Sequence, residues 1–221
     1  MYSVFRFMAW TVVLVVVAQF VVVAARAQEA KPKAMDVAEA VRLVEGYFNG
    51  MGTYQARFEQ RTTGEQWTQE GMFYLNRPKG QFLWNYESPD RQRLIATGTK
   101  LYFVDDEQGG AATELPVKSG LSRLFTGKKL ELAKEGLKAT AAWQTPLQVE
   151  IVLETVGAKE GADMGGMQGM KLTFDREPLA LVKAEVVDAV DAVTTVQLAD
   201  IKQGVVMDGR MFKYTPRLSN P

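Results

Sequence analysis

The chain has 221 residues with 26 basic and 26 acidic side chains, and it contains neither cysteine nor histidine. A balanced charge argues against a nucleic-acid partner, because a phosphate-binding surface needs an excess of lysine and arginine. The two missing residue types exclude cysteine nucleophiles, serine–histidine triads, disulfides and ordinary zinc sites. The hydrophobic content of 47% still predicts a folded domain.

The N-terminal segment has the pattern of an export signal. Arg6 precedes a nearly all-apolar run from Ala9 to Ala25, and Ala25-Arg26-Ala27 matches a signal-peptidase site. We therefore expect residues 1–27 to be cleaved and residues 28–221 to form one exported domain. The alternative is an uncleaved membrane anchor, since the apolar run reaches the lower length limit of a membrane-spanning helix. Without cysteine, the exported chain is not expected to carry a lipid anchor.

Residues 37–48 are expected to form an amphipathic helix. Asp36 is a candidate N-cap, with Glu39 three residues later in a variant of the capping box. Apolar residues follow at helical spacing. Gly50 and Gly52 are expected to end the helix.

After this helix, apolar and polar residues alternate, which is typical of strands with one buried face. A short helical insert at 119–138 interrupts them, with Leu121, Leu124 and Phe125 at helical spacing and a break at Gly127. We expect strands near residues 54–59, 65–76, 81–87, 91–96, 100–104, 111–117, 148–156, 170–174, 181–187, 194–198 and 211–214.

These ten or eleven strands predict a single, strongly curved antiparallel sheet that is open or nearly closed. One face of such a sheet points inward and must be covered, and the helix and the insert are the available covers. Residues 28–35 are expected to be a loose leader. Residues 161–169 are expected to be a loop rich in glycine and methionine.

An aromatic row is the most informative feature of the strands. Phe82, Trp84 and Tyr86 alternate along one strand, so they project from the same face. Such a row is either a packed core face or the wall of an apolar cavity. In the preceding turn, Arg77 is either a solvated arginine or a clamp that holds a lid shut by hydrogen bonds to its carbonyls.

Four blocks of the chain resemble the LolA family of periplasmic outer-membrane lipoprotein carriers. In order, they are MGTYQARFEQ, QEGMFYLNRPKGQFLWNYESP, LIATGTKLYFVDD and TTVQLADIKQGVVMDGRMFKYTP. The spacing of Arg-Pro and Phe-x-Trp is fairly specific, and the order of the blocks is more so. The chain departs from the family by one extra residue between Pro78 and Phe82, and by a C-terminus that stops soon after the last block.

The resemblance implies a mainly β fold, an open (unclosed) antiparallel β-barrel of about 11 strands with an N-terminal helix and a short helical lid over an apolar cavity. It implies that Arg77 latches the lid, and that Leu121, Leu124 and Phe125 belong to the lid. The residues expected to line the acyl-chain cavity are Tyr54, Phe58, Phe73, Phe82, Trp84, Tyr86, Leu101 and Phe103.

The function implied by the resemblance is that of a non-enzymatic, monomeric periplasmic carrier without cofactor or metal. It would take the acyl chains of lipoproteins from an inner-membrane ABC transporter and pass them to a LolB-like receptor lipoprotein of the outer membrane. The LolB receptor itself is excluded, since it needs a lipid-bearing cysteine. The alternative is a half-barrel that senses lipid or lipoprotein and regulates the envelope, although such proteins usually carry a second domain.

An enzymatic interpretation would depend on carboxylates. Asp105, Asp106 and Glu107 could suggest a calcium site or a carboxylate pair, but the spacing of a calcium loop is missing. We expect this cluster to be a solvated hairpin turn. Glu150 and Glu154 are likewise expected to face solvent.

Overall fold

The computed structural model describes residues 31–115, 122–126, 129–156 and 166–214. One twelve-stranded antiparallel sheet dominates this part of the chain and does not close, because β1 and β7 remain as its two edges. The strand order is β1-β8-β9-β10-β11-β12-β2-β3-β4-β5-β6-β7. The expected signal peptide and leading residues up to 30 lie outside the described part.

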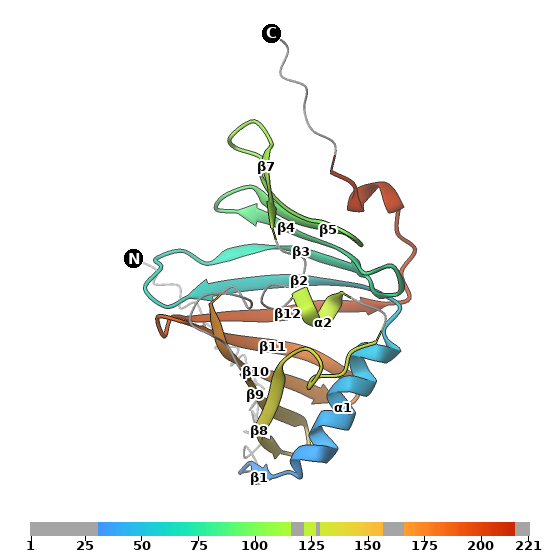
Figure 1. Cartoon of the computed structure of the whole chain (residues 1–221), viewed down its shortest axis with the longest axis vertical. Coiled ribbons are helices and arrows are strands. Elements are labelled where there is room, and N and C mark those ends of the chain that lie inside the picture. Colours follow the sequence, from blue (N-terminus) through green and yellow to red (C-terminus); the bar gives the residue numbers. More distant parts are fainter. Residues whose placement is uncertain (1–30, 116–121, 127–128, 157–165, 215–221) are drawn as a thin grey trace, which may run out of the picture.

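The strands are β1 (Lys33–Ala34), β2 (Thr53–Thr62), β3 (Gln69–Asn76), β4 (Gln81–Ser88), β5 (Gln92–Thr97), β6 (Leu101–Asp105), β7 (Ala111–Leu115), β8 (Leu137–Gln144), β9 (Gln148–Thr155), β10 (Met167–Arg176), β11 (Leu179–Asp188) and β12 (Val193–Gln203). The helices are α1 (Val37–Gly50), α2 (Ser122–Phe125) and the 3₁₀ turns η1 (Arg77–Lys79) and η2 (Gly209–Phe212). Figure 1 shows the sheet curling around α1 and α2, which lie on its inner side. The predicted open, mainly β fold is confirmed.

Helix α1 begins as the sequence predicts. The Asp36 side chain accepts a hydrogen bond of 2.8 Å from the backbone N–H of Glu39, which satisfies one free donor of the first turn. The predicted end is wrong in detail. Gly50 is still helical, and the cap is Met51 in an extended conformation, so no left-handed glycine ends the helix. The face that α1 buries comprises Ala40, Val44, Tyr47 and Phe48.

Several predicted segments need correction. Strand β8 falls where the sequence predicted part of the insert and then nothing, because its run of alanines hides the alternation. Strand β10 begins at Met167, inside the predicted glycine- and methionine-rich loop. The predicted leader contains β1, which pairs with the end of β8. Over the described residues the sheet therefore has twelve strands, close to the predicted number of about eleven.

The outer face of the sheet carries a second, smaller core under η2. Phe212 is fully buried there against Leu83, Ile95 and Val104, and the rings of Tyr102 and Tyr214 lie 5.0 Å apart. The predicted last strand at residues 211–214 is therefore wrong. Residues Gly209–Phe212 form the 3₁₀ turn η2, which places Phe212 in this outer core.

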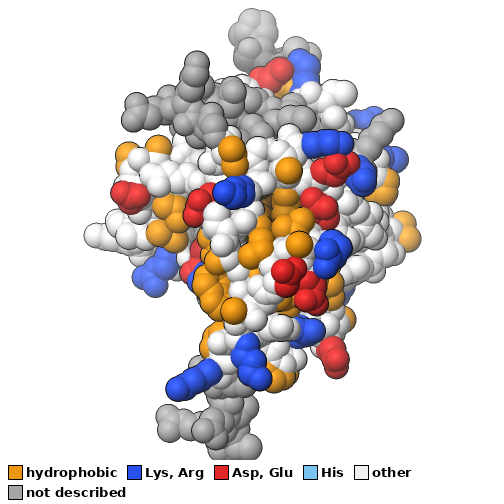
Figure 2. All heavy atoms as spheres, turned by 60° about the horizontal axis from the view of Figure 1, so that its bottom comes forward, with side chains coloured by type: hydrophobic (Ala, Val, Ile, Leu, Met, Phe, Trp, Pro, Cys, Tyr) orange, Lys and Arg blue, Asp and Glu red, His pale blue; other side chains and the backbone are white. Residues whose placement is uncertain are grey.

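Hydrophobic side chains also reach the surface at the end that carries β1 and the start of α1. Figure 2 looks toward this end and shows apolar side chains gathered at the middle of the surface, between scattered lysine, arginine, aspartate and glutamate side chains. The surface on this side therefore carries both signs of charge. Within the described ranges, no helix combines the length and apolar character needed to cross a bilayer.

The close pairing of β3 and β4 depends on a glycine. A Cβ placed on Gly71 would lie 1.9 Å from the backbone oxygen of Asn85, next to an irregularity in the register of the two strands. Real side chains do not approach a carbonyl so closely. The two backbones must therefore separate if any other residue stands at this position.

We predict opposite effects for two glycine-to-alanine changes. Gly71→Ala should lower the free energy of unfolding by roughly 3 kcal/mol, at the upper end of the usual cost of overpacking. Gly46→Ala, at an exposed position of α1 with open space around it, should raise the free energy of unfolding by about 0.5–1 kcal/mol. Urea unfolding followed by circular dichroism measures both. Equal stability of Gly71→Ala and wild type would contradict the packing described here.

Candidate functional site: a covered aromatic face

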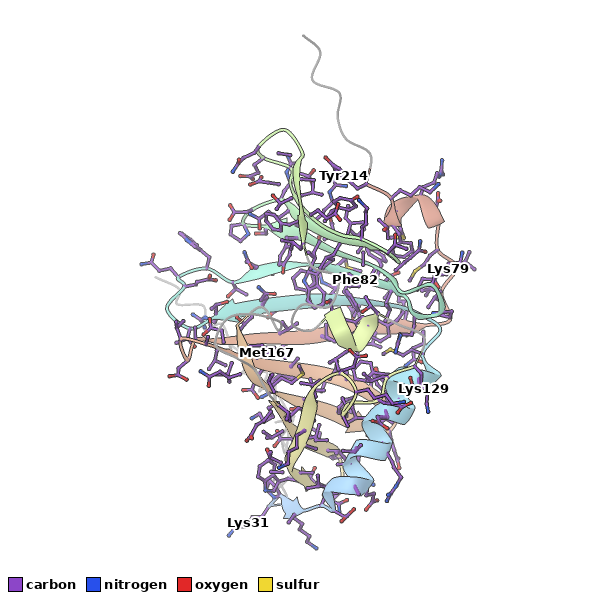
Figure 3. All side chains as sticks on the ribbon, in the orientation of Figure 1. Lys31, Lys79, Phe82, Lys129, Met167 and Tyr214 are labelled. Atoms are coloured by element: carbon purple, nitrogen blue, oxygen red, sulfur yellow. The ribbon has the colours of Figure 1, made fainter. Side chains whose placement is uncertain are left out.

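The predicted aromatic row lies on the inner face of the sheet. Strand β4 contributes Phe82, Trp84 and Tyr86, and the register places Phe73 of β3 opposite Trp84. Phe58 of β2 lies beside them, with its ring centre 4.8 Å from that of Trp84. Figure 3 labels Phe82 at the middle of the molecule, among the side chains that fill the curve of the sheet.

Ring contacts run along this face without a break. Ring centres are 6.2 Å apart for Phe82 and Phe73, 4.6 Å for Phe73 and Trp84, and 5.1 Å for Phe58 and Tyr86. Rings at such distances pack edge-to-face or tilted, which adds to the burial of apolar surface. The residues of this group that are less than a tenth exposed are Tyr54, Phe58, Phe73, Phe82 and Trp84.

The last two residues predicted for this face differ from one another. Leu101 is buried in the same core cluster. Phe103, two residues along β6, is half-buried and is not part of that cluster. The structure therefore groups Leu101 with the aromatic face and leaves Phe103 outside that cluster. The role of both residues in lining an acyl-chain cavity stays a prediction.

A polar band borders the aromatic face at the hairpin between β2 and β3. The Tyr86 hydroxyl donates to Gln60 Oε1 at 3.2 Å, and the Gln60 amide donates to Gln69 Oε1 at 3.0 Å. Burial raises the pKa of Tyr86 to about 12, so the phenol stays neutral at ordinary pH. The inner face thus changes along its length from phenylalanine rings to hydrogen-bonded amides.

Helix α2 covers the other end of the aromatic face. The Phe125 ring centre lies 5.0 Å from that of Phe73, 6.2 Å from that of Phe82 and 5.9 Å from that of Phe48 in α1. Leu124 is fully buried beside it. The predicted lid segment therefore lies against the aromatic face as the single-turn helix α2, with Phe125 in contact with Phe73 and Phe82. Its role as a lid stays a prediction.

The third residue predicted for the lid, Leu121, lies outside the described residues. The described residues of the predicted insert that follow α2, 129–138, do not form a helix. Residues 131–136 form hydrogen-bonded turns, and strand β8 begins at Leu137. Leu130 and Leu132 are buried before and within these turns, and Leu137 is buried at the start of β8.

Two polar side chains of α1 hold the segment after α2, and the sequence did not identify them. Asn49 accepts from the backbone N–H of Leu130 at 2.6 Å and donates to its carbonyl at 2.9 Å. Glu45 accepts from the N–H of Leu132 at 2.8 Å. Both satisfy backbone groups that secondary structure leaves free. Their polar positions on a helix gave no signal that distinguishes them from solvated residues.

Arg77 is buried, with 3% of its surface exposed, so the solvated interpretation is wrong. Its backbone N–H donates to the carbonyl of Gly52 at 3.0 Å, which fixes η1 against the start of β2. Burial lowers the pKa of Arg77, and the negative charge of Glu135, in the turns after α2, works in the opposite direction. Lys79, two residues later, extends away from the molecule (Figure 3).

The acidic turn after β6 has a structural explanation. Asp105 accepts from the backbone N–H groups of Glu107 and Gln108 at 3.0 and 3.1 Å. The two carboxylate oxygens of Asp106 accept from Nε and Nη2 of Arg93 at 2.7 and 2.6 Å. The Asp105 carboxylate thus binds backbone groups of its own turn, and the Asp106 carboxylate binds the neighbouring strand β5. Across the described ranges, no group of three or more acidic residues is arranged to hold a metal ion.

The remaining predicted carboxylates belong to the outer surface. Glu154 is exposed, and Glu150 is half-buried and accepts from the Thr173 hydroxyl at 3.4 Å. Glu150 also borders a hollow of about 430 Å³. A second hollow of about 510 Å³ lies along β2 and β12. The first mixes charged and amide groups with apolar ones, and the second is lined mainly by hydroxyl, amide and charged side chains. Neither hollow includes Phe73, Phe82 or Trp84 in its lining.

Comparison with known proteins places this unclosed half-barrel in a family. The family model for outer membrane lipoprotein carrier protein LolA matches residues 49–215, and the chain belongs to this family. An outer-membrane lipoprotein carrier protein of Methylococcus capsulatus is 26% identical over 189 residues, covering 78% of this chain and 82% of the relative. One of Legionella pneumophila (strain Paris) is 26% identical over 182 residues, covering 80% and 86%.

A solved structure shares the fold at a much greater sequence distance. An uncharacterized conserved protein from Thermus thermophilus superimposes with a TM-score of 0.51 at 10% identity, covering 81% of this chain and 95% of the other. The curved sheet with its covered inner face is therefore an architecture that very different sequences adopt.

We predict that Asn49 limits the opening of the segment after α2. Asn49→Ala removes two hydrogen bonds at Leu130 and should speed hydrogen exchange of that amide at least fivefold, since one such bond contributes about 1 kcal/mol. Arg42→Ala, at an exposed position of the same helix, should leave the exchange rate unchanged. Amide exchange measured by NMR compares the three proteins, and unchanged exchange in Asn49→Ala would contradict the restraint.

Proposed function

We propose that this protein is a periplasmic carrier that buries the acyl chains of outer-membrane lipoproteins against its aromatic inner face. Family membership supports the carrier role, and the names of its relatives describe the same cargo. The observation that carries the proposal is the contact of Phe125 with Phe73 and Phe82, because it is a small cover over a large apolar face. The alternative of a regulatory sensor has no such support.

The physical need for a carrier follows from the cost of exposing acyl chains. Each CH₂ group in water costs about 0.8 kcal/mol, so a multiply acylated protein does not leave a membrane unaided at a useful rate. A carrier must bury these chains and also release them. A cover of one helical turn suits both needs, since it hides the apolar face without ligand and presents little surface to displace.

The direction of transport requires partners at both membranes. We infer that an inner-membrane ABC transporter loads the protein and that a receptor lipoprotein of the outer membrane unloads it. The chain has no GxxxxGK[ST] motif, so the energy for loading would come from the transporter. No step of this cycle needs a catalytic group of the carrier.

Within this cycle, Arg77 is proposed to latch the cover. It is buried in η1, at the end of the face where Phe82 meets Phe125, and its charge acts on Glu135 in the segment after α2. A buried guanidinium can hold several backbone or carboxylate oxygens at once, each contributing on the order of 1–3 kcal/mol. Such a latch keeps the unloaded protein closed.

A release assay tests the carrier role. Purified protein lacking residues 1–27 is added to spheroplasts that synthesise a labelled lipoprotein. We expect labelled lipoprotein in the supernatant as a soluble one-to-one complex, and none with an unrelated periplasmic protein. Retention of all label in the spheroplasts, while a known carrier with its own transporter releases it, would contradict the proposed role.

We predict that Arg77→Leu slows unloading. Loss of the latch should favour the open, loaded state, so transfer of bound lipoprotein to a receptor should fall by tenfold or more, while loading is retained. Lys79→Leu, which changes an exposed charge in the same turn, should transfer cargo like wild type. Transfer measured by co-purification with the receptor distinguishes the two variants. Normal transfer by Arg77→Leu would contradict the latch.

A further inference from the structure

The aromatic face changes in polarity along one direction. At the end covered by α2, Phe73, Phe82 and Phe125 form an apolar surface without polar atoms in their side chains. At the hairpin between β2 and β3, the face ends in the hydrogen-bonded chain from Tyr86 to Gln60. Trp84 lies between these ends, in contact with Phe73 on one side and Phe58 on the other.

The indole of Trp84 carries a feature that packing does not explain. Trp84 is 7% exposed, and its Nε1–H has no hydrogen-bond acceptor among the residues that the structure describes. A buried donor without an acceptor destabilises a folded protein, and buried indole N–H groups usually find a partner. A phenylalanine would keep most of the ring contacts without this cost.

The order of groups on this face matches the order of groups in an acylated ligand. A glyceride or acylated cysteine has a polar head, then ester or amide carbonyl groups, and then hydrocarbon chains. With the head at the polar band and the chains under α2, the carbonyl groups fall in the middle region. A carbonyl oxygen there would supply the acceptor that the indole lacks.

We propose that the Trp84 indole N–H donates a hydrogen bond to an ester or amide carbonyl of the bound acyl chains and so sets how deeply they enter. This inference rests on the proposed function and adds a polar contact to it. The ligand class is a molecule whose chains are joined through carbonyl groups. Chains joined through ethers lack the acceptor and should bind less well.

A two-by-two binding experiment tests the contact. The probes are monomeric dihexanoyl-phosphatidylcholine, which has ester carbonyls, and its dihexyl ether analogue, which has none. The proteins are wild type and Trp84→Phe, and calorimetry gives each dissociation constant. We expect wild type to bind the ester two- to tenfold more tightly than the ether, which is the range for one neutral hydrogen bond. Trp84→Phe should bind the two probes equally.

A control and a second readout keep the outcome clear. Trp67→Phe, in the exposed hairpin between β2 and β3, should retain the ester preference. In ¹⁵N-tryptophan NMR of the protein lacking residues 1–27, the indole signals come from Trp67, Trp84 and Trp143. The ester should shift the Trp84 indole proton downfield, as a new hydrogen bond does, and the ether should not.

Three results would overturn the inference. If Trp84→Phe still prefers the ester, Trp84 is not the donor. If wild type binds ester and ether equally, Trp84 is again not the donor, although acyl binding itself is retained. An unshifted Trp84 signal in the ester complex would exclude Trp84 in the same way without any mutation. If wild type binds neither lipid, the acyl-binding role itself is contradicted, and the inference fails with it.

Discussion

The structure depends on one constraint, which is that a broad aromatic surface must be kept from water. The inner face of β2, β3 and β4 carries this surface, and the contact of Phe125 with Phe73 and Phe82 is what closes it. The surrounding elements serve that contact. Helix α1 supplies Phe48 beneath Phe125, and Asn49 at its end holds the segment that follows α2.

Packing on the outer face of the sheet supports the strands that carry this surface. Strand β4 is buried on both sides, since Phe82 and Trp84 face inward while Leu83 packs outward against Phe212 of η2. Gly71 lets the backbones of β3 and β4 approach closely beside these ring contacts. The sheet is therefore packed on both faces, whereas the described part of the cover, α2, is a single helical turn.

Much of the fold could be predicted from the sequence wherever a local pattern determines the secondary structure. The alternation of apolar and polar residues predicted β2 through β7, and Asp36 predicted the start of α1. Both signals lie within a few neighbouring residues. The failures have tertiary causes. The alanine-rich β8 has no pattern of its own, and Phe212 fills the outer face in a 3₁₀ turn, which no local signal indicates.

For the site, the sequence identified the aromatic side chains but not the polar side chains that form hydrogen bonds around them. Asn49 and Glu45 act on backbone groups about 80 residues away in the chain, and Gln60 is recognisable only through Tyr86. The burial of Arg77 was likewise decided by the segments that pack over η1. Such roles depend on distant pairings that a single sequence does not display.

The most direct test of the central claim is a measurement of what touches the aromatic face when cargo is bound. Intermolecular NOEs from a lipoprotein with ¹³C-labelled acyl chains report these contacts. The proposed mechanism predicts NOEs from the chains to the rings of Phe73 and Phe82, together with loss of the Phe125–Phe73 NOE of the free protein. Chains that contact the outer face around Leu83 and Ile95, with the Phe125–Phe73 NOE preserved, would contradict it.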